Sequence, residues 1–207
     1  MSEYHKIETL YERDEKTHRI KPELILKNSV YGLLKTWQFT EKIDGTNIRL
    51  IWQSEPESLR IGGKTDNAQI HVELISNIEG LELREKFREV FPAASVALYG
   101  EGYGAGIQKG GDYSPTKKFI LFDVLVDAKW WLNWENTCDV ARKLGLDTVP
   151  YIGEMTLEDA TRMVRKGFQS RLNDGKAKAE GLVGRPAEAL FDKKGARLIV
   201  KLKTKDF

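Results

Sequence analysis

The first candidate for chemistry in this sequence is a lysine flanked by acidic residues. In EKIDGTNIRL, residues 41–50, Lys42 lies between Glu41 and Asp44, just before Gly45. A lysine amine attacks only when it is deprotonated, and its ordinary pKa of about 10.4 keeps it protonated near pH 7. Nearby cations or loss of solvent lower that pKa. Two interpretations stand side by side: a solvated lysine in an ordinary hairpin, and a nucleophile at the rim of a nucleotide pocket.

More lysines gather toward the end of the sequence. In ARLIVKLK, Lys201 and Lys203 occupy alternate positions of an expected strand and therefore point to the same face. Two ammonium groups there would favour a neutral amine on Lys42 and stabilise a phosphate. A solvent-facing edge strand is the alternative. Six basic residues against one acidic residue occur in each of two stretches, Arg162–Lys178 and Lys193–Phe207, which indicates either a phosphate-attracting face or solvated surface lysines.

The composition limits the classes of protein. The 207 residues are 41% hydrophobic, enough for one substantial core or two closely joined subdomains, and the net charge of +2 gives no argument for a polyanionic partner. The single cysteine, Cys138, excludes an internal disulfide framework, and its apolar helical surroundings predict burial. His5, His18 and His71 are scattered and suggest no catalytic group. Without a signal-like or membrane-length apolar run, we expect a soluble cytoplasmic protein.

The expected elements in the first part of the chain are mainly strands. Asp44-Gly45 is a strong hairpin signal, so the strands on either side of it are predicted to pair. Between residues 70 and 91 the apolar side chains recur at helical spacing, with a break expected at Gly80. These apolar residues are Val72, Ile75, Ile78, Leu83, Phe87 and Val90. The strands are expected over residues 37–43, 46–53, 58–63, 95–101 and 118–126.

The second part of the chain predicts two helices and two further strands. One helix starts near Asn133 and ends before Gly145, and another starts at Thr156 in a capping box with Asp159. Its buried stripe is expected to consist of Leu157, Ala160, Met163, Val164 and Phe168. After a polar loop, residues 180–186 and 196–203 are expected to be strands. Because strands and helices do not alternate regularly, we predict an α+β fold with mainly antiparallel sheets and flanking helices.

Six short motifs in order carry a family resemblance. They are KIDG, GGKTDNAQI, YGEGYGAGIQKGG, FILFDV, EGLVGR and LIVKLK. This set resembles the covalent nucleotidyltransferase superfamily of polynucleotide ligases and mRNA capping enzymes, and within it the nick-sealing RNA ligases of tailed phages. The resemblance runs from Trp37 to the last residues. It implies an ATP-grasp-like ligase adenylation domain over residues 1–207, a single adenylyltransferase domain without the C-terminal OB-fold or helical domain of many relatives.

The resemblance implies roles for the residues around the lysine. Lys42 would attack the α-phosphorus of ATP, giving lysyl-AMP and pyrophosphate, with Lys201 and Lys203 beside the phosphate. Glu41 would accept a hydrogen bond from the adenine amino group; half of a surface ion pair is the alternative. Asn47 would help to hold the phosphate, its hydrated metal or the ribose, unless it only supports the turn.

Further nucleotide contacts are implied by the other motifs. Glu101 would accept a ribose hydroxyl, and Phe122 would stack on adenine unless it belongs to the core. Glu180 would bind the divalent ion, Mg²⁺ or Mn²⁺, that neutralises the ATP phosphates. Lys64 stands where the family usually has arginine, which removes bidentate phosphate recognition. Arg60 is a nearby substitute.

The implied activity is ATP-dependent joining of a 5′-phosphate end to a 3′-hydroxyl end, in RNA by preference and at nicks, as in RNA repair. The two basic stretches would contact strand phosphates. The cluster Trp130, Trp131 and Trp134 would either stack on bases or belong to the core. The resemblance places the protein in the cytoplasm, in the host if a phage encodes it, and leaves its oligomeric state open.

Three other functions compete with this one. A minimal DNA ligase is the nearest rival, although GIQK and TDNAQ resemble the phage RNA ligases and argue against it. A non-catalytic nick-binding or end-binding module would share the fold. A capping guanylyltransferase fits less well, because Glu41 suits the amino group of adenine, whereas guanine presents an acceptor at that position.

Overall fold

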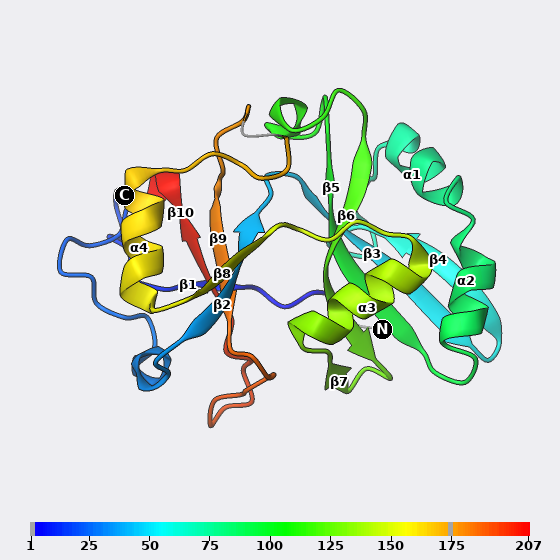
Figure 1. Ribbon diagram of the computed structural model, residues 1–207, viewed down its shortest axis with the longest axis horizontal. Coiled ribbons are helices and arrows are strands. Elements are labelled where there is room, and N and C mark those ends of the chain that lie inside the picture. Colours follow the sequence, from blue (N-terminus) through cyan, green and yellow to red (C-terminus); the bar gives the residue numbers. More distant parts are fainter. Residues whose placement is uncertain (1–2, 174–175) are drawn as a thin grey trace. The chain divides into compact units, whose positions relative to one another are not determined.

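The computed structural model describes residues 3–173 and 176–207, and it divides into two compact units (Figure 1). Unit 1 contains the N-terminal residues through His5 together with Asp44–Val149, and unit 2 contains Lys6–Ile43 and Pro150–Phe207. Asp174, the single acidic residue of the first basic stretch, lies outside the described residues. Helices accompany two largely antiparallel sheets, so the predicted α+β class is confirmed.

Unit 1 is built on a five-stranded antiparallel sheet with the order β4-β3-β5-β6-β7. Its strands are β3 (Thr46–Ser54), β4 (Glu57–Gly62), β5 (Val96–Tyr103), β6 (Lys118–Val126) and β7 (Trp130–Trp131). Its described helices are α1 (Val72–Glu79), α2 (Leu83–Val90), α3 (Trp134–Leu144) and the short 3-10 helix η2 (Gly110–Asp112). The strands predicted from the sequence are all present, and β7 is an addition that the sequence did not predict.

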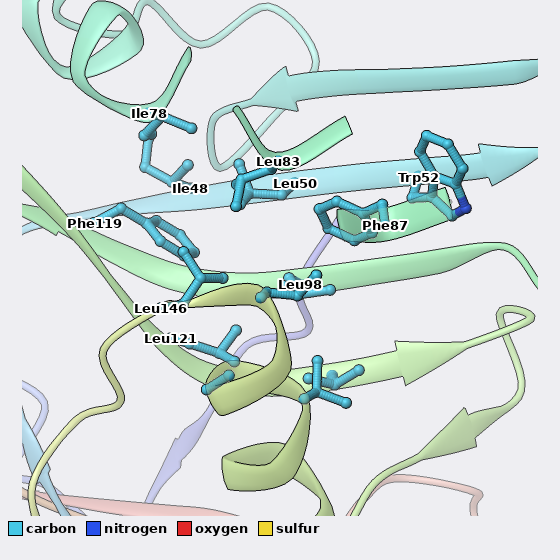
Figure 2. Packing of buried hydrophobic residues seen from close by; sticks show 14 of the residues in the cluster. Ile48, Leu50, Trp52, Ile78, Leu83, Phe87, Leu98, Phe119, Leu121 and Leu146 are labelled. Atoms are coloured by element: carbon cyan, nitrogen blue, oxygen red, sulfur yellow. The ribbon is translucent and has the colours of Figure 1, made fainter. Parts of the chain in front are cut away.

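The main core of unit 1 lies between one face of this sheet and the helices. Ile48, Leu50 and Trp52 alternate along β3 and point into this core. Figure 2 shows the ring of Phe87, from α2, next to Trp52; the two rings are stacked with their centroids 5.6 Å apart. Because successive strand residues point to opposite faces, Asn47 and the other intervening residues of β3 must project from the opposite face.

The helix boundaries of unit 1 follow the predicted signals. Gly80 ends α1, and the Asn133 side chain accepts the backbone N–H of Asn136 at the start of α3. Two details differ from the prediction. Val72 is 76% exposed, and the neighbouring Leu74 is buried in its place. Cys138 is half-buried rather than buried.

Unit 2 is built on a second five-stranded sheet, with the order β1-β10-β9-β2-β8. All neighbours are antiparallel except β1 and β10, which are parallel. Its strands are β1 (Glu8–Thr9), β2 (Trp37–Lys42), β8 (Tyr151–Met155), β9 (Gly181–Arg185) and β10 (Val200–Lys203). Its described helices are α4 (Leu157–Lys166) and the 3-10 helices η1 (Ser29–Leu33) and η3 (Thr204–Asp206).

A second core supports the unit 2 sheet. Helix α4 stands beside β10 (Figure 1) and begins at Thr156, whose hydroxyl accepts the backbone N–H of Asp159, as the capping box predicted. Ala160 and Val164 of α4 are fully buried against Trp37 and other sheet residues. No helix in the described ranges combines the length and the apolar character needed to cross a membrane.

The predicted hairpin around Asp44-Gly45 is wrong. Strands β2 and β3 flank this dipeptide, but β2 pairs with β8 and β9, whereas β3 pairs with β4 and β5. Neither residue, both in the described part of the chain, has the positive φ that tight hairpin turns use. The glycine serves a close approach instead, since a Cβ at Gly45 would lie 2.3 Å from the carbonyl oxygen of Gly102.

Candidate active site

Two lysines and one carboxylate form an ion-paired cluster in unit 2. Lys42 ends β2 and Lys203 ends β10, and both are register partners of Gly181 at the start of β9. Glu180, the residue just before β9, therefore lies between the two lysines. Its Oε2 accepts a hydrogen bond from Lys42 Nζ at 2.7 Å, and its Oε1 accepts one from Lys203 Nζ at 2.6 Å. The side chain of Glu180 is only 12% exposed, so the carboxylate is the most enclosed member of this lysine–carboxylate cluster.

The charges of the lysines keep the carboxylate of Glu180 ionised. Burial by itself would raise the pKa of Glu180, but the charge of Lys42 and hydrogen bonds from Lys203 and Lys42 outweigh burial, so the pKa is lowered. Glu180 is therefore ionised at neutral pH. One carboxylate shared by two ammonium groups leaves net positive charge, which is suited to a phosphate.

Lys201 adds a third cation to this region. It alternates with Lys203 along β10, and both side chains are half-buried on the same face, as predicted. Burial lowers the pKa of Lys201, and the charges of Lys203 and Lys42 lower it further. The structure thus brings together the catalytic lysines predicted from the sequence.

Glu41 lies next to the candidate nucleophile but is almost fully enclosed, at 1% exposure. Its Oε2 accepts the backbone N–H of Arg171 at 2.8 Å, while its Oε1 has no hydrogen-bond partner among the described residues. Burial raises the pKa of Glu41, against the hydrogen bonds from Ser170 and Arg171. A surface ion pair, the alternative from the sequence, does not fit this burial. A buried acceptor with an open position suits a donor from a ligand.

Unit 1 carries a separate set of polar candidates on the sheet face opposite its main core. Asn47 of β3 lies directly across from Glu101 of β5. The Oδ1 atom of Asn47 is buried and has no hydrogen-bond partner in the described chain. Glu101 is half-buried. These two residues occupy the face expected for a polar role, although their contacts with a nucleotide remain predictions.

A β-bulge decides the position of Phe122. The register of β5 with β6 shifts after the Tyr99–Asp123 pair, and Phe122 is the additional residue of β6. Its ring lies 5.1 Å from that of Tyr4, in a small cluster that also includes Trp131. Phe122 thus lies outside the main core of unit 1 and packs against a second, smaller hydrophobic cluster, which agrees in part with the core alternative from the sequence. Stacking on adenine remains a prediction.

Arg49 is a charged residue that sequence reasoning missed. Its side chain is completely buried, with Nε donating to the carbonyl oxygen of Gly63 at 2.7 Å and Nη2 donating to Asp66 Oδ1 at 2.8 Å. It thereby ties β3 to the loop that carries Lys64. Lys64 and Arg60 are both exposed. The available signal was the alternation of Arg49 with Asn47, which places an arginine on the polar face of a strand.

The three tryptophans considered for base stacking separate in the structure. Trp134 is buried at the start of α3, and Trp131 packs near Tyr4. Trp130 is 61% exposed, with Lys129 Nζ lying 4.9 Å from its ring centroid. Only Trp130 of this trio keeps a largely accessible ring.

The family model for RNA ligases matches residues 35–203, a range that contains all of the candidate site residues. The chain belongs to the RNA ligase family. A search of curated proteins finds no match. The family match confirms the superfamily resemblance drawn from the six motifs.

Solved structures of an RNA ligase from Naegleria gruberi share the fold of this RNA ligase family member. One variant, solved with ATP and Mn, is 16% identical with a TM-score of 0.72, covering 99% of this chain and 56% of that one. A second, also with ATP and Mn, is 18% identical with a TM-score of 0.65, covering 84% and 52%. A third, with AMP and Mn, is 17% identical with a TM-score of 0.65, covering 83% and 50%. The chain therefore spans about half the length of these ligases.

Glu180 is the candidate metal ligand of this RNA ligase family chain. Among the described residues, no group of three or more His, Cys, Asp or Glu side chains could hold a metal ion. Mg²⁺ commonly binds through one or two carboxylates, with phosphates and water supplying the other ligands. A single ionised carboxylate next to a phosphate-attracting cluster fits that mode, in which the nucleotide brings most of the ligands.

Proposed function

We propose that the protein is an ATP-dependent RNA ligase that carries AMP on Lys42. The observation that carries this proposal is the cluster in which Lys42 and Lys203 share the carboxylate of Glu180, with Lys201 beside them. Family membership and the shared fold support it. Residues 1–207 are proposed to be a single adenylyltransferase domain.

In the first step, the neutral amine of Lys42 attacks the α-phosphorus of ATP. A nitrogen–phosphorus bond forms, the bond to pyrophosphate breaks, and the amine loses its proton. Lys201 and Lys203 stabilise the negative charge that builds up on the phosphate oxygens. Glu180 holds Lys42 and Lys203 at fixed distances before ATP binds, which reduces the cost of orienting the nucleophile.

The second and third steps transfer and release AMP. An oxygen of the RNA 5′-phosphate attacks the phosphorus of lysyl-AMP, the nitrogen–phosphorus bond breaks, and Lys42 recovers its proton. The 3′-hydroxyl of the neighbouring strand then attacks the activated 5′-phosphorus and loses its proton. A phosphodiester forms and AMP leaves. We propose a nicked RNA duplex in the cytoplasm as the substrate, with the two basic stretches contacting its phosphates.

Further nucleotide contacts are proposed residue by residue. In unit 2, the open acceptor Oε1 of Glu41 would take the adenine amino group. In unit 1, Glu101 would accept a ribose hydroxyl and Asn47 would hold phosphate or ribose, while Phe122 would stack on the base. Lys64 would contact the ATP phosphates.

A divalent ion would be held by Glu180 and by the ATP phosphates. Its contribution would be to neutralise phosphate charge, so that a neutral amine can approach the α-phosphorus. Arg60, exposed on β4, is the proposed cationic substitute if Lys64 reaches the phosphates poorly.

The test is covalent labelling with ATP that carries a radioactive α-phosphate. Intact mass must first show that the preparation carries no AMP. We expect label that survives denaturation on the parent and on Lys27→Ala, which removes an exposed lysine of unit 2, and none on Lys42→Ala. An unlabelled, folded parent would overturn the proposal in favour of a non-catalytic nick-binding module.

Substrate identity is tested by sealing. RNA and DNA nicks on the same template are offered to the adenylylated protein, and we expect faster sealing of the RNA nick. Equal or faster sealing of DNA would assign the protein as a minimal DNA ligase. Covalent label from GTP in place of ATP would indicate a guanylyltransferase.

A further inference from the structure

A groove of about 290 Å³ opens in unit 2, apart from the lysine–carboxylate cluster. Its lining includes Lys166 and Gly167 at the end of α4, Phe168 and Gln169 after it, and Lys178 and Thr204 on the other side. Two ammonium groups, an amide and a hydroxyl thus surround one half-buried aromatic ring. No carboxylate side chain belongs to the lining among the described residues.

The groove is built by a short antiparallel pairing of two segments, one that follows α4 and one that precedes β9. Gln169 and Lys178 are bridge partners, and the backbone N–H of Ala179 donates to the carbonyl oxygen of Phe168 at 3.0 Å. This pairing fixes the two sides of the groove relative to each other. Lys166 and Lys178 are exposed on it, so both ammonium groups are available to a ligand.

The groove wall continues directly into the candidate active site. Lys178 precedes Glu180 by two residues, and Thr204 follows Lys203 in the chain. The backbone N–H of Thr204 donates to the carbonyl oxygen of Glu180 at 2.9 Å, which joins the two segments. Residues that line the groove are therefore only one or two positions in the chain from Glu180 and Lys203, the residues proposed to act on phosphate.

We propose that this groove binds a phosphodiester and its ribose in the RNA strand next to the junction. Lys166 and Lys178 would contact the phosphate, Gln169 and Thr204 would hydrogen-bond to phosphate or sugar oxygens, and Phe168 would pack against the sugar or base. The inference rests on the proposed ligase function and adds a strand-binding subsite to it.

A strand phosphate fits the groove better than the polyphosphate of ATP. The volume of the groove, about 290 Å³, lies just below the range for ligand pockets, about 300–1,000 Å³, which suits one nucleotide unit of a longer chain. Its lysines are also distinct from those that converge on Glu180. Binding of a strand phosphate by two lysines depends strongly on salt, because counterions are released from the nucleic acid.

The test compares two double variants of unit 2. Lys166→Ala with Lys178→Ala removes the groove cations, and Lys16→Ala with Lys27→Ala removes two exposed lysines outside both basic stretches. Affinity for a fluorescent nicked RNA duplex is measured against salt concentration, and labelling with ATP is measured separately. Melting temperature is recorded for each variant, because Lys166 also lies in the last turn of α4.

We expect the groove variant to bind RNA roughly tenfold more weakly at low salt, with the slope of log affinity against log salt reduced by about 1, because the two lysines contact one phosphate. Its labelling with ATP should match the parent, and the control pair should match the parent in both assays. Equal RNA affinity in the two double variants would overturn the inference. Loss of ATP labelling in the groove variant would reassign the groove to ATP, as would displacement of RNA from the parent by pyrophosphate alone.

These outcomes are separable from failure of the proposed function. RNA binding is measured on protein without ATP, so it reports on the groove whether or not Lys42 is adenylylated. An unlabelled parent that still binds RNA through the groove would refute catalysis and keep the subsite. If the parent is labelled and the groove variant binds RNA normally, the proposed catalysis stands and the subsite is refuted.

Discussion

The two units place a cation beside a carboxylate in opposite ways. In unit 2 the carboxylate of Glu180 is 12% exposed, while the lysines paired with it, Lys42 and Lys203, are 21% and 19% exposed. In unit 1 the cation is the buried partner: Arg49 is 0% exposed, and its acid Asp66 is 65% exposed. The enclosed group is the fixed one in each case. Unit 2 therefore keeps its cations as the more exposed partners, whereas unit 1 encloses a cation that fastens a loop.

Removing the carboxylate from unit 2 should have the largest effect. Glu180→Gln leaves Lys42, Lys201 and Lys203 close together without a compensating charge. We expect ATP labelling to fall a hundred- to thousandfold and the free energy of unfolding to drop by about 1–2 kcal/mol at pH 7. Glu154→Gln, an exposed acid of the same unit, is the matched control. An unchanged labelling rate would show that the cluster does not organise the nucleophile.

The same variant has a pH signature in the metal-free protein. The pKa of Glu180 is lowered below 4.5 in the folded state. Its ionised form therefore stabilises the fold above pH 4.5, and that stabilisation is lost as pH falls through the lowered pKa. The gap in unfolding free energy between parent and variant should close in acid, which urea titrations at several pH values would measure.

A substitution of Lys201 should separate activity from stability. Its pKa is lowered from 10.5, so the charged form costs stability at every pH below the folded pKa, and the cost disappears as pH rises through 10.5. Lys201→Met should therefore raise the melting temperature slightly at pH 7 while ATP labelling falls roughly tenfold. The gain in melting temperature should shrink in alkaline buffer. A loss of stability at pH 7 would indicate that the charge of Lys201 makes a net favourable interaction in the folded protein.

Releasing the loop of unit 1 should have the smallest effect. Asp66→Ala removes the exposed end of the tie to Arg49 and leaves the buried hydrogen bond to Gly63 in place. We expect the KM for ATP in the labelling reaction to rise a fewfold, with the limiting rate nearly unchanged, because Lys64 becomes less well positioned. Glu89→Ala removes an exposed acid elsewhere in unit 1 as a control. Equal KM values for ATP in the two variants would show that the loop carrying Lys64 does not contribute to ATP binding.

Local patterns predicted the elements well but not their pairing. Alternation along residues 46–53 predicted a strand, the apolar pattern predicted a helix start near Asn133, and the capping box predicted one at Thr156. The structure confirms all three. The Asp44-Gly45 signal gave a wrong hairpin, because it describes only the local turn. Which strands pair is decided by the packing of residues far apart in the chain, and this is why β2 and β3 belong to different sheets.

The candidate site was predicted in the same uneven way. Residue types singled out Lys42 and Lys203, the family resemblance added Glu180, and the structure brings these three together. The role of Arg49 depends on the loop that folds over it, and no short motif encodes that contact. The placement of Phe122 depends on a one-residue bulge in β6, which alternation by itself does not reveal.

The order of strands in unit 2 has a consequence for synthesis. Its sheet joins β1 and β2, made early, to β8, β9 and β10, made after the whole of Asp44–Val149. Unit 1 draws nearly all of its residues from one continuous segment and can therefore fold while translation continues. Lys42 must wait until Glu180 and Lys203 have left the ribosome. The nascent chain thus passes through a period in which its candidate nucleophile exists without the carboxylate that holds it, and the chemistry proposed for Lys42 requires the assembled sheet of unit 2.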